Sequence, residues 1–132
     1  MINEINSYFT TIYYHLHTTH EDVISHQGVR ILQMIQKEEE VTVRDIAEFL
    51  YISHNTASEH IKKLERHGWV QKERAAEDQR KVLLHLTQEG LQVLKKNAEL
   101  DDAKLQDALN RLTEQEQQAI LQAFRRLSEV AK

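Results

Sequence analysis

The chain has 132 residues, a formal net charge of −4, and neither Cys nor Pro. The absence of Cys excludes disulfides, thiolate metal sites and cysteine-based redox sensing. No basic segment followed by an apolar run begins the chain, and no apolar run is long enough to span a bilayer, so we expect a cytoplasmic protein without a membrane partner. A chain of this length suits a single domain, residues 1–132, and the lack of Pro favours long helices.

The N-terminal third predicts two helices. Apolar residues recur at helical spacing from Ile5 to Leu16 and predict a first helix that ends near His20. Ser25 is placed to cap a second helix, whose apolar face includes Leu32.

The middle of the chain predicts a helix, a tight turn, a capped helix and a hairpin. Thr42–Asp45 has the pattern of a capping box, with Asp in place of the usual Glu or Gln, and opens a short helix. Ser53 caps the next helix, and Gly68 ends it as a residue with positive φ. The hydrophobic period then changes from 3.6 to 2, which predicts a β-hairpin of residues 69–74 and 82–86.

The C-terminal part predicts two further helices. Thr87 is placed to cap a long helix that continues to Leu112. Thr113 follows as the cap of a last helix, which carries Phe124 and Leu127 on its apolar face.

The predicted fold class is mainly α with a small β-hairpin wing. A winged helix-turn-helix occupies residues 25–90, and residues 1–22 and 87–132 supply dimerisation helices. We expect a homodimer because the apolar stripes of the first and last helices are too long for 132 residues to bury within one monomer. The alternative is that these two helices pack against each other within one chain.

The distribution of charge favours DNA as the partner of this region. Residues 53–81 hold seven Lys or Arg against five Asp or Glu. In a helix-turn-helix, the start of the second helix reads base edges, and basic residues nearby contact phosphates. An Arg on a hairpin tip can enter the minor groove, and a neighbouring Asp can orient it. The predicted DNA-binding residues are Ser53, His54, Asn55, Thr56, Ser58, Lys62, Lys63, Arg74, Asp78, Arg80 and Lys81.

Three motifs in this region resemble the MarR family of bacterial transcription regulators. They are a Leu-Glu-x-x-Gly helix ending, an Asp-x-Arg wing and a Leu-Thr-x-x-Gly helix start, found here as Leu64-Glu65…Gly68, Asp78…Arg80 and Leu86-Thr87…Gly90. The resemblance implies a homodimeric repressor that binds a pseudo-palindromic operator in double-stranded DNA and is released by a small ligand. One departure is Glu59, which stands where many members have a basic residue; we expect it to face away from DNA.

The sequence is compatible with other functions as well. The histidines near residues 15–26 suggest a zinc-responsive repressor with His17, His20 and His26 as candidate ligands, although their spacing is poor and we predict neither a metal nor a cofactor. A pocket for an effector between the dimerisation helices and the reading head, lined by residues such as Tyr8 and Trp69, is a further alternative. A winged helix that binds a protein instead of DNA is the main rival. No nucleophilic Cys, Gly-rich phosphate loop or His-Glu-x-x-His motif is present, so we predict that the chain is not an enzyme.

Overall fold

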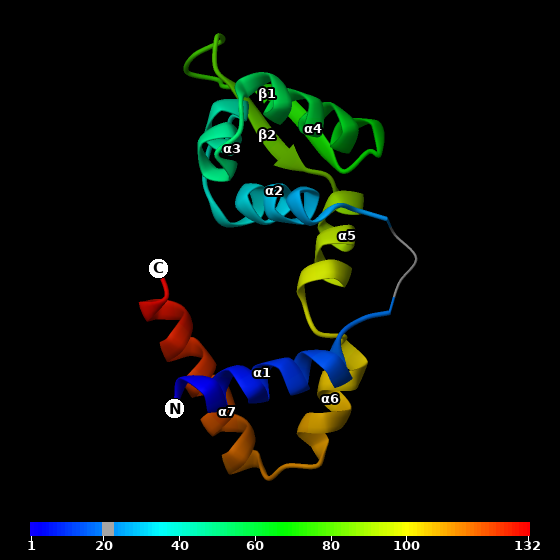
Figure 1. Ribbon diagram of the computed structural model, residues 1–132, viewed down its shortest axis with the longest axis vertical. Helices are drawn as coiled ribbons and strands as arrows, with labels where there is room; N and C mark the ends of the chain where they lie inside the picture. The colour runs from blue at the N-terminus through cyan, green and yellow to red at the C-terminus, as the bar shows by residue number, and fades with distance from the viewer. Residues whose placement is uncertain (20–22) are drawn as a thin grey trace. The chain divides into compact units, whose positions relative to one another are not determined.

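The computed structural model describes residues 1–19 and 23–132, which fold as two compact units (Figure 1). The central unit comprises Thr18–Glu99, and the terminal unit comprises Met1–His17 together with Leu100–Lys132. The described residues contain seven helices and one two-stranded antiparallel sheet, as the predicted fold class requires. Among these residues, no helix has the length and hydrophobicity of a membrane-spanning segment.

The central unit contains four helices and the hairpin. Its elements in chain order are α2 (His26–Lys37), α3 (Val43–Leu50), α4 (His54–Arg66), β1 (Val70–Arg74), β2 (Val82–Leu86) and α5 (Gln88–Ala98). The strands pair with Val70 opposite Leu86 and Arg74 opposite Val82. Figure 1 shows α2, α3 and α4 around the hairpin, whose tip extends beyond the helices.

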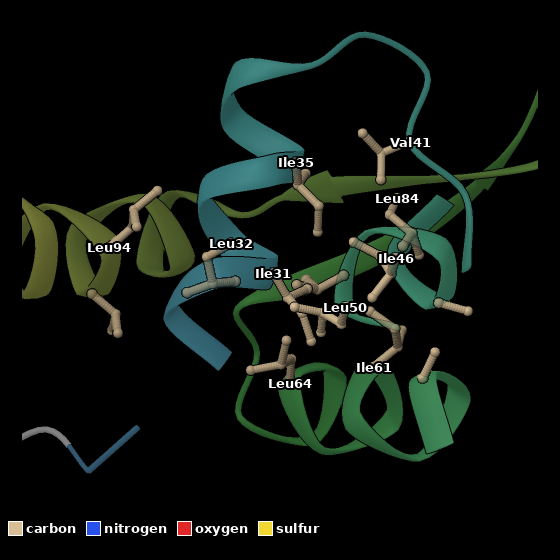
Figure 2. Packing of buried hydrophobic residues seen from close by; sticks show 14 residues of the cluster. Ile31, Leu32, Ile35, Val41, Ile46, Leu50, Ile61, Leu64, Leu84 and Leu94 are labelled. Carbon is tan, nitrogen blue, oxygen red and sulfur yellow. The ribbon is translucent and has the colours of Figure 1, made fainter. Parts of the chain in front are cut away.

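One hydrophobic cluster holds the elements of the central unit together. Ile31 of α2, Ile46 of α3 and Ile61 of α4 are fully buried and meet at its centre (Figure 2). Ala57 is also fully buried, and its small side chain lets α4 approach its neighbours closely. The buried face of α4 therefore fixes which of its residues point outward.

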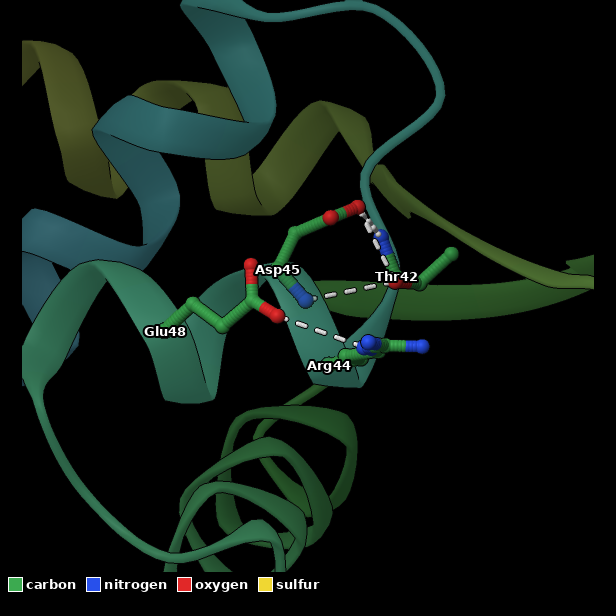
Figure 3. Close-up of polar contacts among 4 residues, drawn as sticks. All are labelled: Thr42, Arg44, Asp45 and Glu48. Atoms are coloured by element: carbon green, nitrogen blue, oxygen red, sulfur yellow. Dashed lines mark hydrogen bonds and ion pairs between the residues drawn. The ribbon is translucent and has the colours of Figure 1, made fainter.

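The predicted helix starts in the central unit are confirmed. Ser25 accepts a hydrogen bond from the Gly28 N–H at 3.0 Å. Thr42 and Asp45 form both halves of the capping box, in which the Asp45 carboxylate accepts from the Thr42 N–H at 2.8 Å (Figure 3). Each cap satisfies backbone donors that a helix start would otherwise leave unpaired.

Two glycines shape the connection between α4, the hairpin and α5. Gly68 has φ +78°, in the left-handed region that side chains disfavour, and ends α4 as predicted. Gly90 has an ordinary backbone conformation, but a Cβ atom there would collide with the carbonyl of Trp69. The first turn of α5 is therefore in direct backbone contact with the start of the hairpin.

The terminal unit consists of α1 (Ile2–Leu16), α6 (Asp102–Asn110) and α7 (Glu114–Val130). The Asp101 N–H donates to the Leu16 carbonyl at 2.8 Å, and Lys104 Nζ donates to the His17 carbonyl at 3.1 Å. None of these three helices contains a buried residue. The hydrogen bonds thus join the first and last thirds of the chain without giving the unit a core of its own.

Two predicted helix boundaries are wrong. The first helix ends at Leu16 instead of near His20, because His17 is extended and its backbone forms a bridge with Leu100. The long helix predicted to run from Thr87 to Leu112 is two helices, because Glu99 is extended and Asp101 caps α6. The break follows from Asp101, whose carboxylate accepts from the Lys104 N–H at 3.0 Å.

Substituting each glycine by Ala is expected to destabilise the protein for a different reason. Gly68→Ala places Cβ in open space but in a left-handed conformation, so we expect a loss of about 1 kcal/mol. Gly90→Ala forces α5 away from the Trp69 carbonyl, so we expect a loss of about 3 kcal/mol or more. Urea unfolding at one protein concentration measures both, and equal losses would contradict the close contact at Gly90.

Candidate nucleic-acid interface

The start of α4 is exposed because its other face is in the core. Ala57, Ile61 and Leu64 are buried, so the residues between them point outward. Ser53 Oγ accepts from the Thr56 N–H at 3.1 Å and donates to Thr56 Oγ1 at 2.9 Å. Ser53 and Thr56, which are both predicted to contact DNA, are thus hydrogen-bonded to each other.

An open groove of about 680 Å³ lies beside this helix start. It is lined by the beginnings of α3 and α4, by β1 and by the returning arm of the hairpin. The lining residues are Thr42, Val43, Arg44, His54, Ser58, Lys72, Glu73, Arg74, Arg80, Lys81 and Val82. Five of them carry a fixed positive charge and one a negative charge, which suits a polyanion.

The hairpin tip holds Arg80 in an exposed position within a turn. Asp78 Oδ1 accepts from the Arg80 N–H at 3.0 Å and from Arg80 Nε at 3.3 Å, so the pairing predicted from the sequence is present. Arg74 Nη1 donates to the Gln79 carbonyl at 2.7 Å, which braces the base of the tip. The Arg80 side chain remains 93% exposed, so a ligand can reach it despite this ion pair.

Five of the predicted DNA-binding residues line the groove. They are His54, Ser58, Arg74, Arg80 and Lys81. Ser53, Asn55 and Thr56 are exposed in the same helix start, and Asp78 is tied to the groove through Arg80. Their contacts with DNA stay a prediction.

Lys62 and Lys63 do not line the groove. Lys62 forms an ion pair at 3.6 Å with Glu59, which is exposed on α4. Lys63 borders a separate cavity of about 210 Å³ between the start of α2 and the far half of α4, together with His60, His67 and Trp69. Their predicted phosphate contacts would therefore lie outside the groove.

Sequence reasoning missed two cations of the groove, Arg44 and Lys72. Arg44 lies in the first turn of α3, two residues after the capping residue Thr42. Lys72 and Arg74 are two residues apart on β1. Side chains at this spacing point to the same face of a strand, so the sequence pattern places both cations together. The capping box and the strand pattern were thus the signals that could have found them.

The histidines considered for zinc do not form a described site. His17 Nδ1 donates to the Tyr13 carbonyl at 2.8 Å in the terminal unit, whereas His26 begins α2 in the central unit. His20 lies outside the described residues. In residues 1–19 and 23–132, no group of three His, Cys, Asp or Glu is arranged to hold a metal ion. The alternative of a zinc-responsive repressor stays untested.

Comparison with known proteins gives the same fold and one family. Residues 24–82 match the MarR family. The HTH-type transcriptional regulator SarZ of Staphylococcus haemolyticus is 26% identical over 53% of this chain, and the organic hydroperoxide resistance transcriptional regulator of Bacillus subtilis is 34% identical over 45%. These matches span only 48% and 40% of the two relatives.

Solved structures extend the likeness to the whole chain. Lactococcus lactis ZitR is 26% identical, with a TM-score of 0.57 over 99% of this chain and 97% of that one. S. aureus MepR bound to ethidium bromide has a TM-score of 0.63 over 99% of this chain and 94% of that one, at 18% identity. At this identity, the similarity to MepR supports the fold alone.

Arg44 offers a direct test of the groove. Arg44→Ala is expected to weaken binding to a duplex of any sequence, because it removes a cation from the lining of the groove, and to lower the slope of log affinity against log salt by about 1. Arg30→Ala is the matched control, since Arg30 stacks over Phe49 and does not line the groove. Fluorescence anisotropy measures both; equal effects would count against the groove.

Proposed function

Since the chain belongs to the MarR family of winged helix-turn-helix transcriptional regulators, we propose that it is a sequence-specific regulator that binds double-stranded DNA through this groove. Members of the family are DNA-binding proteins and not enzymes. The observation that carries the proposal is the convergence of Arg44, Lys72, Arg74, Arg80 and Lys81 from three separate elements on one groove beside the start of α4.

In the proposed complex, the start of α4 lies in the major groove. His54 and Asn55 are exposed there and supply donors and acceptors for base edges. The hairpin tip reaches the neighbouring minor groove, where Arg80 is attracted by its negative potential. Cations of the groove contact the phosphates between these two points.

The proposed regulator is a homodimer that acts in the cytoplasm. Along α1 and α7, large apolar side chains are exposed, among them Phe9 at 59%, Phe124 at 58% and Leu127 at 57%. Exposed apolar faces of this extent on helices without a core are typical of subunit interfaces. A twofold dimer would present two reading heads to a pseudo-palindromic operator.

Repression and release by a small molecule complete the proposal. Both follow from the family, and the MepR structure with ethidium bromide is an instance of a similar fold with a small molecule bound. The residues predicted to line an effector pocket, such as Tyr8 and Trp69, belong to different units. The place of the effector therefore stays a prediction.

Arg80→Ala tests the DNA-binding proposal against the alternative of a winged helix that binds protein. On an operator selected from random duplexes, the variant is expected to lose about tenfold or more in affinity, because the wing contact is removed. Gln79→Ala, at the same tip, serves as the uncharged control.

The wild-type dimer should also protect about two helical turns of that operator from cleavage. A wild-type protein that selects no sequence, or an Arg80→Ala variant that binds as tightly as Gln79→Ala, would contradict the proposal.

Leu127→Glu tests the dimer. A carboxylate in the apolar face of α7 would have to be desolvated in the interface, so we expect a monomer or an unfolded chain where the wild type is a dimer. Gln118→Glu adds the same group on the opposite face of α7 and should stay dimeric. Light scattering across a dilution series decides, and a dimeric Leu127→Glu protein would refute this interface.

A further inference from the structure

Most cations of the groove already have a carboxylate partner within the protein. The pairs and their separations are Arg44–Glu48 at 3.2 Å, Lys72–Glu65 at 3.2 Å, Arg80–Asp78 at 3.3 Å and Lys81–Glu40 at 3.1 Å. Arg74 instead donates to a neutral carbonyl, that of Gln79. Phosphates that approach the groove therefore compete with carboxylates that the chain supplies itself.

The pair between Lys81 and Glu40 differs from the others because it joins distant parts of the chain. Glu40 lies in the connection between α2 and α3, 41 residues from Lys81. Its φ is +52°, a left-handed conformation that a side chain adopts only at a cost. The conformation is stabilised by the next residue, since Val41 is buried and its carbonyl accepts from the Leu84 N–H at 2.8 Å.

The carboxylate of Glu40 is therefore held beside a groove cation by the fold. The side chains of Lys81 and Glu40 are 41% and 57% exposed, so the pair itself contributes little to stability. The pair does reduce the electrostatic attraction between Lys81 and a DNA phosphate. When a phosphate reaches Lys81, Glu40 is close enough to repel it, and the gain from releasing a counterion is offset.

We propose that Glu40 is a specificity-determining residue that lowers the affinity of the groove for the phosphate backbone of any duplex. The inference rests on the proposed DNA-binding function and deepens it. A carboxylate beside the wing weakens binding that depends on charge alone, whereas contacts with base edges at the start of α4 are untouched. Discrimination between operator and other DNA is increased accordingly.

The test is to neutralise Glu40 and measure binding to a short duplex of random sequence. Glu40→Gln is expected to bind about three- to fivefold more tightly than wild type at about 0.1 M salt. The slope of log affinity against log salt should steepen by about 0.9, because Lys81 then neutralises one more phosphate. Lys81→Met in the Glu40→Gln background should abolish both changes.

Glu39→Gln is the matched control, because it removes the same charge from the neighbouring residue, which has no ion pair within the described chain. Its affinity should stay within about 1.5-fold of wild type. Thermal unfolding checks that the variants are folded, and Glu40→Asn, which tolerates left-handed backbone, replaces Gln if needed.

Two results would overturn the inference while the DNA-binding proposal stands. If Glu40→Gln binds no better than Glu39→Gln, the carboxylate does not compete with phosphate. If it binds more weakly, Glu40 instead orients Lys81 for its contact. A wild-type protein that binds no duplex at any salt concentration contradicts the proposed function itself, and is thus distinguished from either result.

Discussion

The candidate interface depends on the packing of α4 against α3 in the core of the central unit. Ile46 and Ile61 are fully buried, and Ala57 allows the close approach. This contact places the starts of both helices so that they line one groove. The hairpin is attached to the same core through Leu84, whose N–H donates to the Val41 carbonyl at 2.8 Å. The helices α3 and α4 and the hairpin are thus attached to one hydrophobic core.

Most of the positive charges in the groove are paired with carboxylates of the protein itself. The net charge of the chain is −4, and four of the five groove cations have a carboxylate within 3.3 Å. Because these carboxylates offset the cations, contacts with phosphates alone contribute little to the affinity for DNA. In the proposed complex, recognition then depends more on base edges and on the shape of the duplex than on phosphates.

Local sequence signals predicted the central unit well. Side-chain caps such as Ser53 and turn residues such as Gly68 act within a few residues of themselves, so their effect can be read directly from the sequence. Sequence reasoning failed where the deciding partner is distant: α1 ends at Leu16 because Leu100 pairs with His17, and Lys81 meets Glu40 from 41 residues away. Such contacts leave no periodic pattern. The functional roles of the site residues stay predictions.

The most direct measurement of the central claim is hydrogen–deuterium exchange with and without a selected operator duplex. Binding through the groove predicts slower exchange in residues 42–45, 53–58 and 72–82, with the start of α2 and the far half of α4 unchanged. Slower exchange confined to α2 and α5, or no change in the hairpin despite saturating duplex, would contradict the claim that this groove is the DNA-binding surface.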